Sequence, residues 1–257
     1  MSKDTDPTRD LVAVEKQGRV TVLILQREAK RNAFDPALSR ALSSALDEYE
    51  DDPEQWVAVL TGGTEMFSAG SDLKEGSERT QRGGEYGIIR RNRLKPLIAA
   101  AEGLALGGGL EVLFCCDIIV AADNIRLGLP EVSRGTLPTS GALFRALRSL
   151  PLHVAKEMVL TGKDLDPRRA LEVGLVNHLV APGSALTVAL EIANVVATNS
   201  PTSTRESLQA MERILASGDE IGWASTQTAL EIVHASHDRK EGISAFFDRR
   251  TPKWTGR

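Results

Sequence analysis

A glycine triplet that runs directly into an apolar segment is the feature that most constrains this chain. Residues 103–117 read GLALGGGLEVLFCCD, so Gly107, Gly108 and Gly109 lead into Glu111. Glycine permits positive φ angles and lets a ligand approach the backbone closely, because it has no Cβ. A helix beginning after the triplet aims unpaired N–H groups, and the positive end of its dipole, at that ligand. The stretch therefore predicts a backbone site for developing negative charge.

Glu111 is unusual for its surroundings. It stands in the first turn of the expected helix, where a carboxylate is favoured, but its neighbours are Leu110, Val112 and Leu113. Burying an unpaired carboxylate among such residues is expensive. Two interpretations are open at this point. Glu111 either caps the helix that follows a glycine-rich turn, or is a functional acid placed in an apolar setting.

Two better-known glycine motifs do not fit these residues. A dinucleotide-binding fingerprint read from Gly107 requires a glycine where Val112 stands. A P-loop read from Gly103 requires Lys and then Ser or Thr where Gly109 and Leu110 stand. Neither NAD nor ATP is therefore indicated.

Size and composition favour one large globular domain, or a core with an appendage. The chain has 257 residues, of which 42% are hydrophobic, and its longest apolar runs are too short to span a bilayer. The N-terminal sequence MSKDTDPTRD lacks the apolar region of a secretory signal and the acid-poor character of a transit peptide. A soluble protein with no membrane partner and a cytoplasmic location is expected.

Charge, cysteine and histidine content exclude several classes of site. The net charge is −4 and basic residues are dispersed, so a nucleic-acid partner is not indicated. Cys115 and Cys116 are adjacent, point apart in a regular helix, and are expected to be packing residues. Of the four histidines only His234 and His237 have helical spacing, and no third ligand accompanies them. No metal site is expected.

The first half of the chain alternates strand and helix patterns. Strands are expected at 11–15, 19–25 and 56–61, and Asp35 followed by Pro36 predicts the start of a helix between the last two. Further strands are expected after Pro96 and at 118–122, with a short strand and loop over 125–141. Alternation of this kind predicts an α/β fold with a parallel sheet.

Two segments of the first half are less regular. Residues 67–76, FSAGSDLKEG, are expected to form a loop entering a short helix. The charged stretch that continues to Arg93 is either a mobile loop over a site or a solvated surface excursion.

The second half is predominantly helical, and the change in pattern predicts a division of the chain. Helices are expected at 142–150, 152–161, 167–173, 183–198, 201–216, 219–236 and 239–249. We therefore expect a core over residues 1–195 and a C-terminal helical region over 196–257.

Two glycine-containing segments are candidates for one oxyanion hole. Residues 67–72 and 107–109 each follow an expected strand and are each expected to open a helix, so their N–H groups can converge on one oxygen. Glu131 lies beyond a further short strand, and together with Glu111 it would form a general acid and base pair around a water molecule. For Glu131 alone, an exposed loop glutamate is the competing interpretation.

The sequence resembles the crotonase, or enoyl-CoA hydratase/isomerase, superfamily over essentially its whole length. The resemblance rests on several long stretches in the family's order. They are REAKRNAFD, FSAGSDLKE, AEGLALGGGLEVLFCCDIIVAA, LGLPEVSRGTLP, EMVLTGKDLDPRRALEVGLVNHLV and KEGISAFFDRRTPKWTGR.

This resemblance implies a fold, a substrate class and site residues. It implies a crotonase-like spiral of ββα units, with a C-terminal helical region used in a homotrimer or a dimer of trimers. It implies an acyl-CoA substrate whose thioester oxygen accepts hydrogen bonds from the backbone N–H groups of Ser71 and Gly108. The residues implied in substrate and CoA binding are Ala69, Asp72, Leu73 and Lys74 along the bound CoA, with Arg31, Asn32 and Ala33 near its pantetheine and adenine end.

The resemblance also favours one reaction. Members that hydrate a double bond hold water between two glutamates, which match Glu111 and Glu131, whereas members that only shift the bond usually lack the first. Reversible hydration of a 2-enoyl-CoA is therefore expected, with no metal and no redox cofactor. The alternatives are double-bond isomerisation, dehydration of a specialised hydroxyacyl-CoA, and an RNA-binding role that the acidic balance disfavours.

Some positions depart from the simple hydratase pattern. Ser71 stands where the family more often has alanine, although its N–H is retained. Thr139-Ser140-Gly141, Leu150-Pro151 and the terminal residues 252–257 resemble the carnitinyl-CoA dehydratase branch. That relation favours a polar or branched acyl group over a straight fatty chain.

Overall fold

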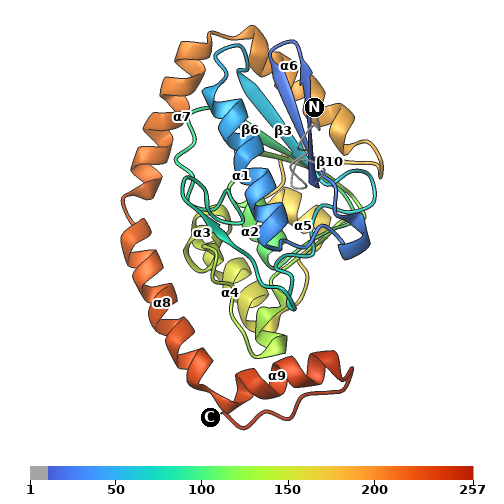
Figure 1. Ribbon diagram of the computed structural model, residues 1–257, viewed down its shortest axis with the longest axis vertical. Coiled ribbons are helices and arrows are strands. Elements are labelled where there is room, and N and C mark those ends of the chain that lie inside the picture. The colour runs from blue at the N-terminus through green and yellow to red at the C-terminus, as the bar shows by residue number, and fades with distance from the viewer. Residues whose placement is uncertain (1–10, 257) are drawn as a thin grey trace, which may run out of the picture.

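The computed structural model describes residues 11–256, which form an α/β fold around a six-stranded sheet (Figure 1). The N-terminal sequence behind the expected cytoplasmic location lies outside the described residues. Strand β1 is antiparallel to β2, and every other pairing in this sheet is parallel. The order across the sheet is β1 (Val12–Gln17), β2 (Val20–Leu25), β3 (Val57–Thr61), β6 (Leu97–Ala101), β8 (Ile118–Ala122) and β10 (His178–Val180).

The main sheet separates two apolar cores, because successive side chains of a strand point to opposite faces of the sheet. In β3, Ala58 and Leu60 face the larger core, whereas Val57 and Val59 face the smaller one. Helix α1 (Pro36–Asp51) packs in the larger core, and α6 (Ala185–Thr198) covers the opposite face with Ala185, Ala189 and Ala193. These alanines lie four residues apart on one side of α6, so the helix approaches the sheet closely. The predicted α/β class is confirmed.

A small second sheet carries the segments that matter for the site. It pairs β7 (Leu104–Leu106) in parallel with β9 (Arg126–Gly128), and Ser68 forms an isolated bridge to Ala105. β7 leads through Gly107 into α2 (Gly108–Leu113), while β9 leads to the 3₁₀ turn η3 (Pro130–Arg134). The short strands β7 and β10 were not expected from the sequence, because three residues are too few to show a period.

Helices make up the rest of the chain and include the C-terminal arm. Helix α3 (Ala142–Ser149), α4 (Leu152–Thr161) and α5 (Pro167–Glu172) precede β10. After α6, helices α7 (Pro201–Ala216), α8 (Asp219–Ala235) and α9 (His237–Phe247) run along one side of the core and turn back beneath it (Figure 1). Helix α8 is fixed by Trp223, whose ring meets Phe144 of α3 edge to face at 5.0 Å. The proposed division at residue 195 falls inside α6 and stays a prediction.

One expected helix is wrong: the segment after Ser71 is a turn. Asp72 Oδ1 accepts hydrogen bonds from the backbone N–H groups of Lys74 and Glu75, at 3.0 and 3.2 Å. A side chain that satisfies these donors stabilises a turn in competition with a helix. Gly76, with φ of +71°, then redirects the chain.

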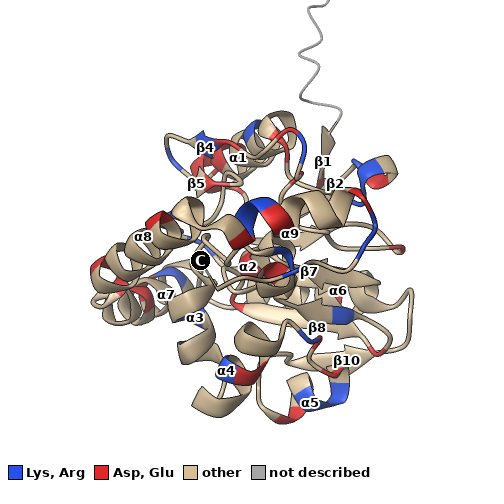
Figure 2. Ribbon diagram, turned by 90° about the horizontal axis from the view of Figure 1, so that it is seen from below, with Lys and Arg blue, Asp and Glu red and all other residues tan. Residues whose placement is uncertain are grey.

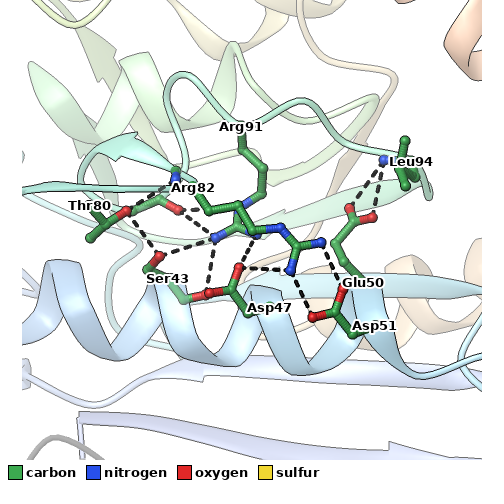
Figure 3. A network of polar contacts seen from close by, with 10 residues as sticks. Ser43, Asp47, Glu50, Asp51, Thr80, Arg82, Arg91 and Leu94 are labelled. Atoms are coloured by element: carbon green, nitrogen blue, oxygen red, sulfur yellow. Dashed lines mark hydrogen bonds and ion pairs between the residues drawn. The ribbon is translucent and has the colours of Figure 1, made fainter.

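The charged stretch before Arg93 packs onto α1 and fits neither expected interpretation. It contains the two short paired strands β4 (Arg79–Thr80) and β5 (Gly84–Glu85), and Tyr86, Ile88 and Ile89 that follow are buried. Figure 3 shows Arg82 and Arg91 reaching acids of α1. The pairing of the buried Arg91 with Asp47, at 2.6 Å, anchors the segment to the core.

No helix within residues 11–256 has both the length and the apolar character needed to cross a membrane.

Candidate active site

A cavity of about 200 Å³ lies where the small sheet, α2 and the C-terminal helices meet. Six of the residues expected at the site line it: Ala69, Ser71, Leu73, Gly108, Glu111 and Glu131. They come from three segments that are far apart in the sequence and are brought side by side by β7, β9 and the bridge at Ser68. The cavity is closed by residues of α8 and α9, among them Val233 and Arg239.

The two segments expected to form an oxyanion hole touch each other at Gly70. A Cβ built on Gly70 would lie 2.8 Å from the backbone nitrogen of Gly108, and Gly70 has φ of +91°. Only glycine fits such a contact in this conformation. The backbones of Ser71 and Gly108 are therefore held close together, and Gly108 opens α2 without a side-chain cap. Backbone N–H groups in the first turn of a helix, together with the helix dipole, favour a negative oxygen, so a role of Gly108 as a donor stays a prediction that this position fits.

Glu111 is buried and held by a segment distant in sequence. The residue is only 2% exposed. Its Oε1 accepts hydrogen bonds from the backbone N–H groups of Ser140 (2.7 Å) and Ala142 (3.1 Å). Burial, with the Glu131 charge as a smaller contribution, raises the pKa of Glu111 to about 8. The interpretation of Glu111 as a cap of its own helix is wrong, because these hydrogen bonds go to residues at the start of α3.

Glu131 faces the cavity from η3 and is not an exposed loop residue. Its Oε1 lies 2.8 Å from the position that a Cβ on Gly107 would take, so the acid rests against the glycine triplet. Its Oε2 is buried and has no hydrogen-bond partner within residues 11–256. Burial raises the pKa of Glu131 to about 7. A carboxylate with one oxygen free in a cavity is available to bind water or substrate.

The sequence interpretation missed Tyr86. This buried residue lines the cavity, and its hydroxyl oxygen lies 2.7 Å from Ser71 Oγ. Its ring packs on Phe34 with centroids 4.9 Å apart, and its oxygen lies 2.5 Å from the position of a Cβ on Gly108. The ring thus fills the space that a side chain at Gly108 would need. Burial raises the pKa of Tyr86 well above its ordinary value, so the hydroxyl stays protonated. The only sign of this role in the sequence is an aromatic residue that lies between glycines within a charged stretch.

Two of the residues expected to bind CoA use their side chains inside the protein. Asn32 is buried, and its Nδ2 donates to the carbonyl oxygens of Gly62 (3.1 Å) and Phe67 (3.2 Å). Asp72 pairs with Arg27 at 3.0 Å in addition to stabilising its turn. These contacts position the loop that carries Ser71.

Three further CoA-binding candidates do not line the cavity. Ala33 is buried, whereas Arg31 and Lys74 are exposed on the surface. A role of their backbones or side chains along a CoA outside the cavity stays a prediction.

Within residues 11–256, no three or more His, Cys, Asp or Glu side chains are grouped so that they could hold a metal ion. Cys115 is buried and Cys116 partly buried, as expected of packing residues.

Known proteins resemble this chain over nearly all of its length. The family described as enoyl-CoA hydratase/isomerase matches residues 15–257. The 2,3-dehydroadipyl-CoA hydratase of Escherichia coli is 36% identical, over 95% of this chain and 98% of that protein. The short-chain-enoyl-CoA hydratase of Clostridium acetobutylicum is 35% identical, over 93% of this chain and 95% of that protein. The crystal structure of a carnitinyl-CoA hydratase from Mycobacterium avium superposes with a TM-score of 0.89 at 35% identity, over 96% of this chain and 99% of that one.

Proposed function

The chain belongs to the enoyl-CoA hydratase/isomerase family, and from this premise we propose that it is an enoyl-CoA hydratase. It adds water reversibly across the double bond of a 2-enoyl-CoA thioester. The observation that carries this proposal is the presence of two acids, the buried Glu111 and the partly buried Glu131, in one cavity beside the start of α2. Relatives that share more than a third of its residues are named as hydratases of CoA thioesters.

The backbone N–H groups of Ser71 and Gly108 stabilise the charge that develops on the thioester oxygen. As water adds at C3, electrons move from the double bond toward the carbonyl, and the thioester becomes enolate-like. The contact between Gly70 and Gly108 keeps both donors in place before the substrate arrives. Donors that are already oriented cost no reorganisation during the reaction, and each is worth about 10²- to 10³-fold in rate.

The two acids move the protons. With pKa values of about 8 and about 7, Glu111 and Glu131 share one proton near neutral pH, so that one is ionised while the other is protonated. The ionised carboxylate takes a proton from the water that adds at C3, and the protonated one delivers its proton to C2. The water supplies the hydroxyl group at C3 and one proton. After the reaction the two carboxylates again hold one proton between them. No metal or redox cofactor is needed for this reaction, since coenzyme A belongs to the substrate.

An assay with two esters tests this function against the alternatives. Hydration of 2-butenoyl-CoA removes its conjugated double bond and lowers its ultraviolet absorbance, whereas isomerisation of a 3-enoyl-CoA creates that absorbance. We expect the first change and not the second. Conversion of the 3-enoyl ester alone would support an isomerase. Inactivity on both, with activity on a specialised hydroxyacyl-CoA, would support a dedicated dehydratase.

We also propose that the protein is a homotrimer or a dimer of trimers. Large apolar side chains lie exposed along the C-terminal arm, at Met211, Ile214, Ile221 and Ile232. Exposed apolar surface of this extent is typical of an interface. Light scattering coupled to size exclusion measures the mass directly, and a monomer would contradict the proposal. The cytoplasmic location stays a prediction, which cell fractionation tests.

A further inference from the structure

Two arginines line the wall of the cavity that η3 and α9 build together. Arg134 ends η3, and Arg239 lies in the first turn of α9. The two elements are in backbone contact, because a Cβ on Gly135 would lie 3.0 Å from the Cα of Arg239. In Figure 1, α9 crosses the lower end of the molecule, and Figure 2 looks onto it. The elements that carry the two arginines therefore lie next to each other, and both residues line the cavity.

Neither arginine has a carboxylate partner within 4 Å in the part of the chain that the structure describes. Arg250, which follows α9, differs in this respect, since it pairs with Glu241 of that helix at 2.6 Å. Asp238, the acid next to Arg239, accepts hydrogen bonds from the N–H groups of Thr255 and Gly256 instead. Asp238 is thus engaged elsewhere, whereas Glu131 lies on the same turn as Arg134, and its charge acts on that arginine.

Arg239 also carries a buried N–H group without an acceptor. Its Nε is shielded from solvent and lacks a hydrogen-bond partner within residues 11–256. Leaving a buried charged donor unpaired is costly, and the cost is recovered when a ligand supplies the acceptor. Arg134 is partly buried, and the ring of Phe246 lies 4.9 Å from its guanidinium carbon. An aromatic face holds a guanidinium in place and leaves its N–H groups free at the edge.

The roles assigned to the other residues of the cavity leave one part of the substrate for this wall. The thioester oxygen is assigned to Ser71 and Gly108, and carbons C2 and C3 to Glu111 and Glu131. The remainder of the acyl group continues into the rest of the cavity, which Leu137, Pro138, Val233 and Arg239 also line. A cavity of about 200 Å³ is small beside the 300–1,000 Å³ of sites for drug-sized ligands, so the acyl group is short.

We propose that the acyl group of the substrate ends in a carboxylate, which Arg239 and Arg134 bind in this cavity. This inference rests on the enoyl-CoA hydratase function proposed above. Guanidinium groups suit the task because their N–H donors match the two oxygens of a carboxylate. Apolar side chains that line the same cavity, Leu137 and Val233 among them, cover the carbons in between.

The test compares two 2-enoyl-CoA esters with six acyl carbons, one ending in a carboxylate and the other in a methyl group. For the intact protein we expect kcat/KM to be at least about 10-fold higher with the carboxylate ester. Arg239→Met removes the charge and keeps an apolar stem, and should lower kcat/KM for the carboxylate ester about 10- to 100-fold more than for the methyl ester. Arg239→Lys should restore part of the preference.

Lys240→Met is the matched control, because Lys240 is an exposed cation on the same helix that does not line this cavity. It should leave the ratio of the two esters unchanged. Equal losses with both esters in Arg239→Met would overturn the inference, since that result places Arg239 near the CoA phosphates or in the fold. A methyl ester that is hydrated as well as the carboxylate ester would overturn it too, while leaving the hydratase function intact.

Binding separates failure of this inference from failure of the hydratase function. Calorimetry with the two saturated esters measures the preference without catalysis, and we expect tighter binding of the ester that carries the carboxylate. If neither unsaturated ester is hydrated, the hydratase proposal fails and the calorimetric preference still decides the carboxylate proposal. Equal affinities for the two saturated esters would overturn it.

Discussion

The two walls of the cavity are built differently. The core wall, formed by residues 107–113 and the Ser71 loop, rests on the sheet, and every residue of α2 is buried. Glu111 on this wall has hydrogen bonds from two backbone N–H groups. The cover wall, formed by η3, α8 and α9, is more exposed and carries two buried polar atoms without partners within residues 11–256, Glu131 Oε2 and Arg239 Nε.

This contrast indicates a division of roles. Groups on the core wall are held by contacts within the protein, so they suit the steps common to all substrates, namely stabilising the thioester oxygen and storing a proton. Groups on the cover wall have unmet hydrogen-bonding capacity, so they suit binding of water and of the variable end of the acyl group. Glu131 then joins the two roles, because it lies on the cover wall and, in the proposed mechanism, takes part in proton transfer.

The largest expected effect comes from removing either acid. Glu111→Gln and Glu131→Gln should each lower kcat at least about 100-fold, since a positioned proton-transfer group contributes roughly 10²- to 10⁴-fold. Affinity for a saturated CoA ester, measured by calorimetry, should change little. Glu172→Gln, at an exposed position, is the control. Near-normal turnover in Glu131→Gln would mean that only groups on the core wall take part in the reaction.

Removing a backbone donor from the core wall should have the next largest effect. Gly108→Pro deletes the N–H at the first position of α2, where proline is compatible with a helix. Gly108→Ala is the control, because it meets Tyr86 in the same way but keeps the N–H. The proline variant should lose about 10²- to 10³-fold more kcat than the alanine variant. Equal losses in the two variants would mean that this N–H does not contact the thioester.

The pH dependence tests whether the acids of the two walls act as a pair. Below about pH 7 both carboxylates become protonated and the base is lost, and above about pH 8 both become ionised and the acid is lost. We therefore expect kcat/KM to rise to a maximum between these values and to fall on either side. The two apparent pKa values belong to the pair. A profile that is flat from pH 6 to 9 would contradict paired action.

A smaller effect is expected from the hydroxyl groups at Ser71 and Tyr86. Ser71→Ala retains the backbone N–H and removes one hydrogen bond, worth about 0.5–1.5 kcal/mol. It should lower kcat by about 13-fold at most, which is the rate factor equivalent to about 1.5 kcal/mol, and Tyr86→Phe should do the same. Because the two hydroxyls contact each other, the double variant should lose less than the product of the single losses. A loss of 100-fold in Ser71→Ala would show that the core wall acts through a side chain.

The contrast between the walls also explains what could be predicted from sequence. The strands of the main sheet other than β10, the glycine triplet and the apolar setting of Glu111 follow from local patterns, because strand periodicity and glycine content are read over a few residues. The turn after Ser71 was missed because Asp72 satisfies its backbone donors, a choice that the helix-like pattern does not reveal.

Residues that come together only in three dimensions could not be assigned from the sequence. Tyr86 reaches Ser71 because its segment packs onto α1. Arg239 reaches the cavity because α9 folds back beneath the core. In both cases the local sequence is ordinary, and contacts between distant segments decide the role.

The most direct test of the account is the fate of water oxygen. A 2-enoyl-CoA is incubated with the protein in H₂¹⁸O, and the product is analysed by mass spectrometry. The account predicts one ¹⁸O at C3 of a 3-hydroxyacyl-CoA, with uptake strongly slowed in both Glu111→Gln and Glu131→Gln. A shifted double bond without ¹⁸O, or uptake at a normal rate in either variant, would contradict it.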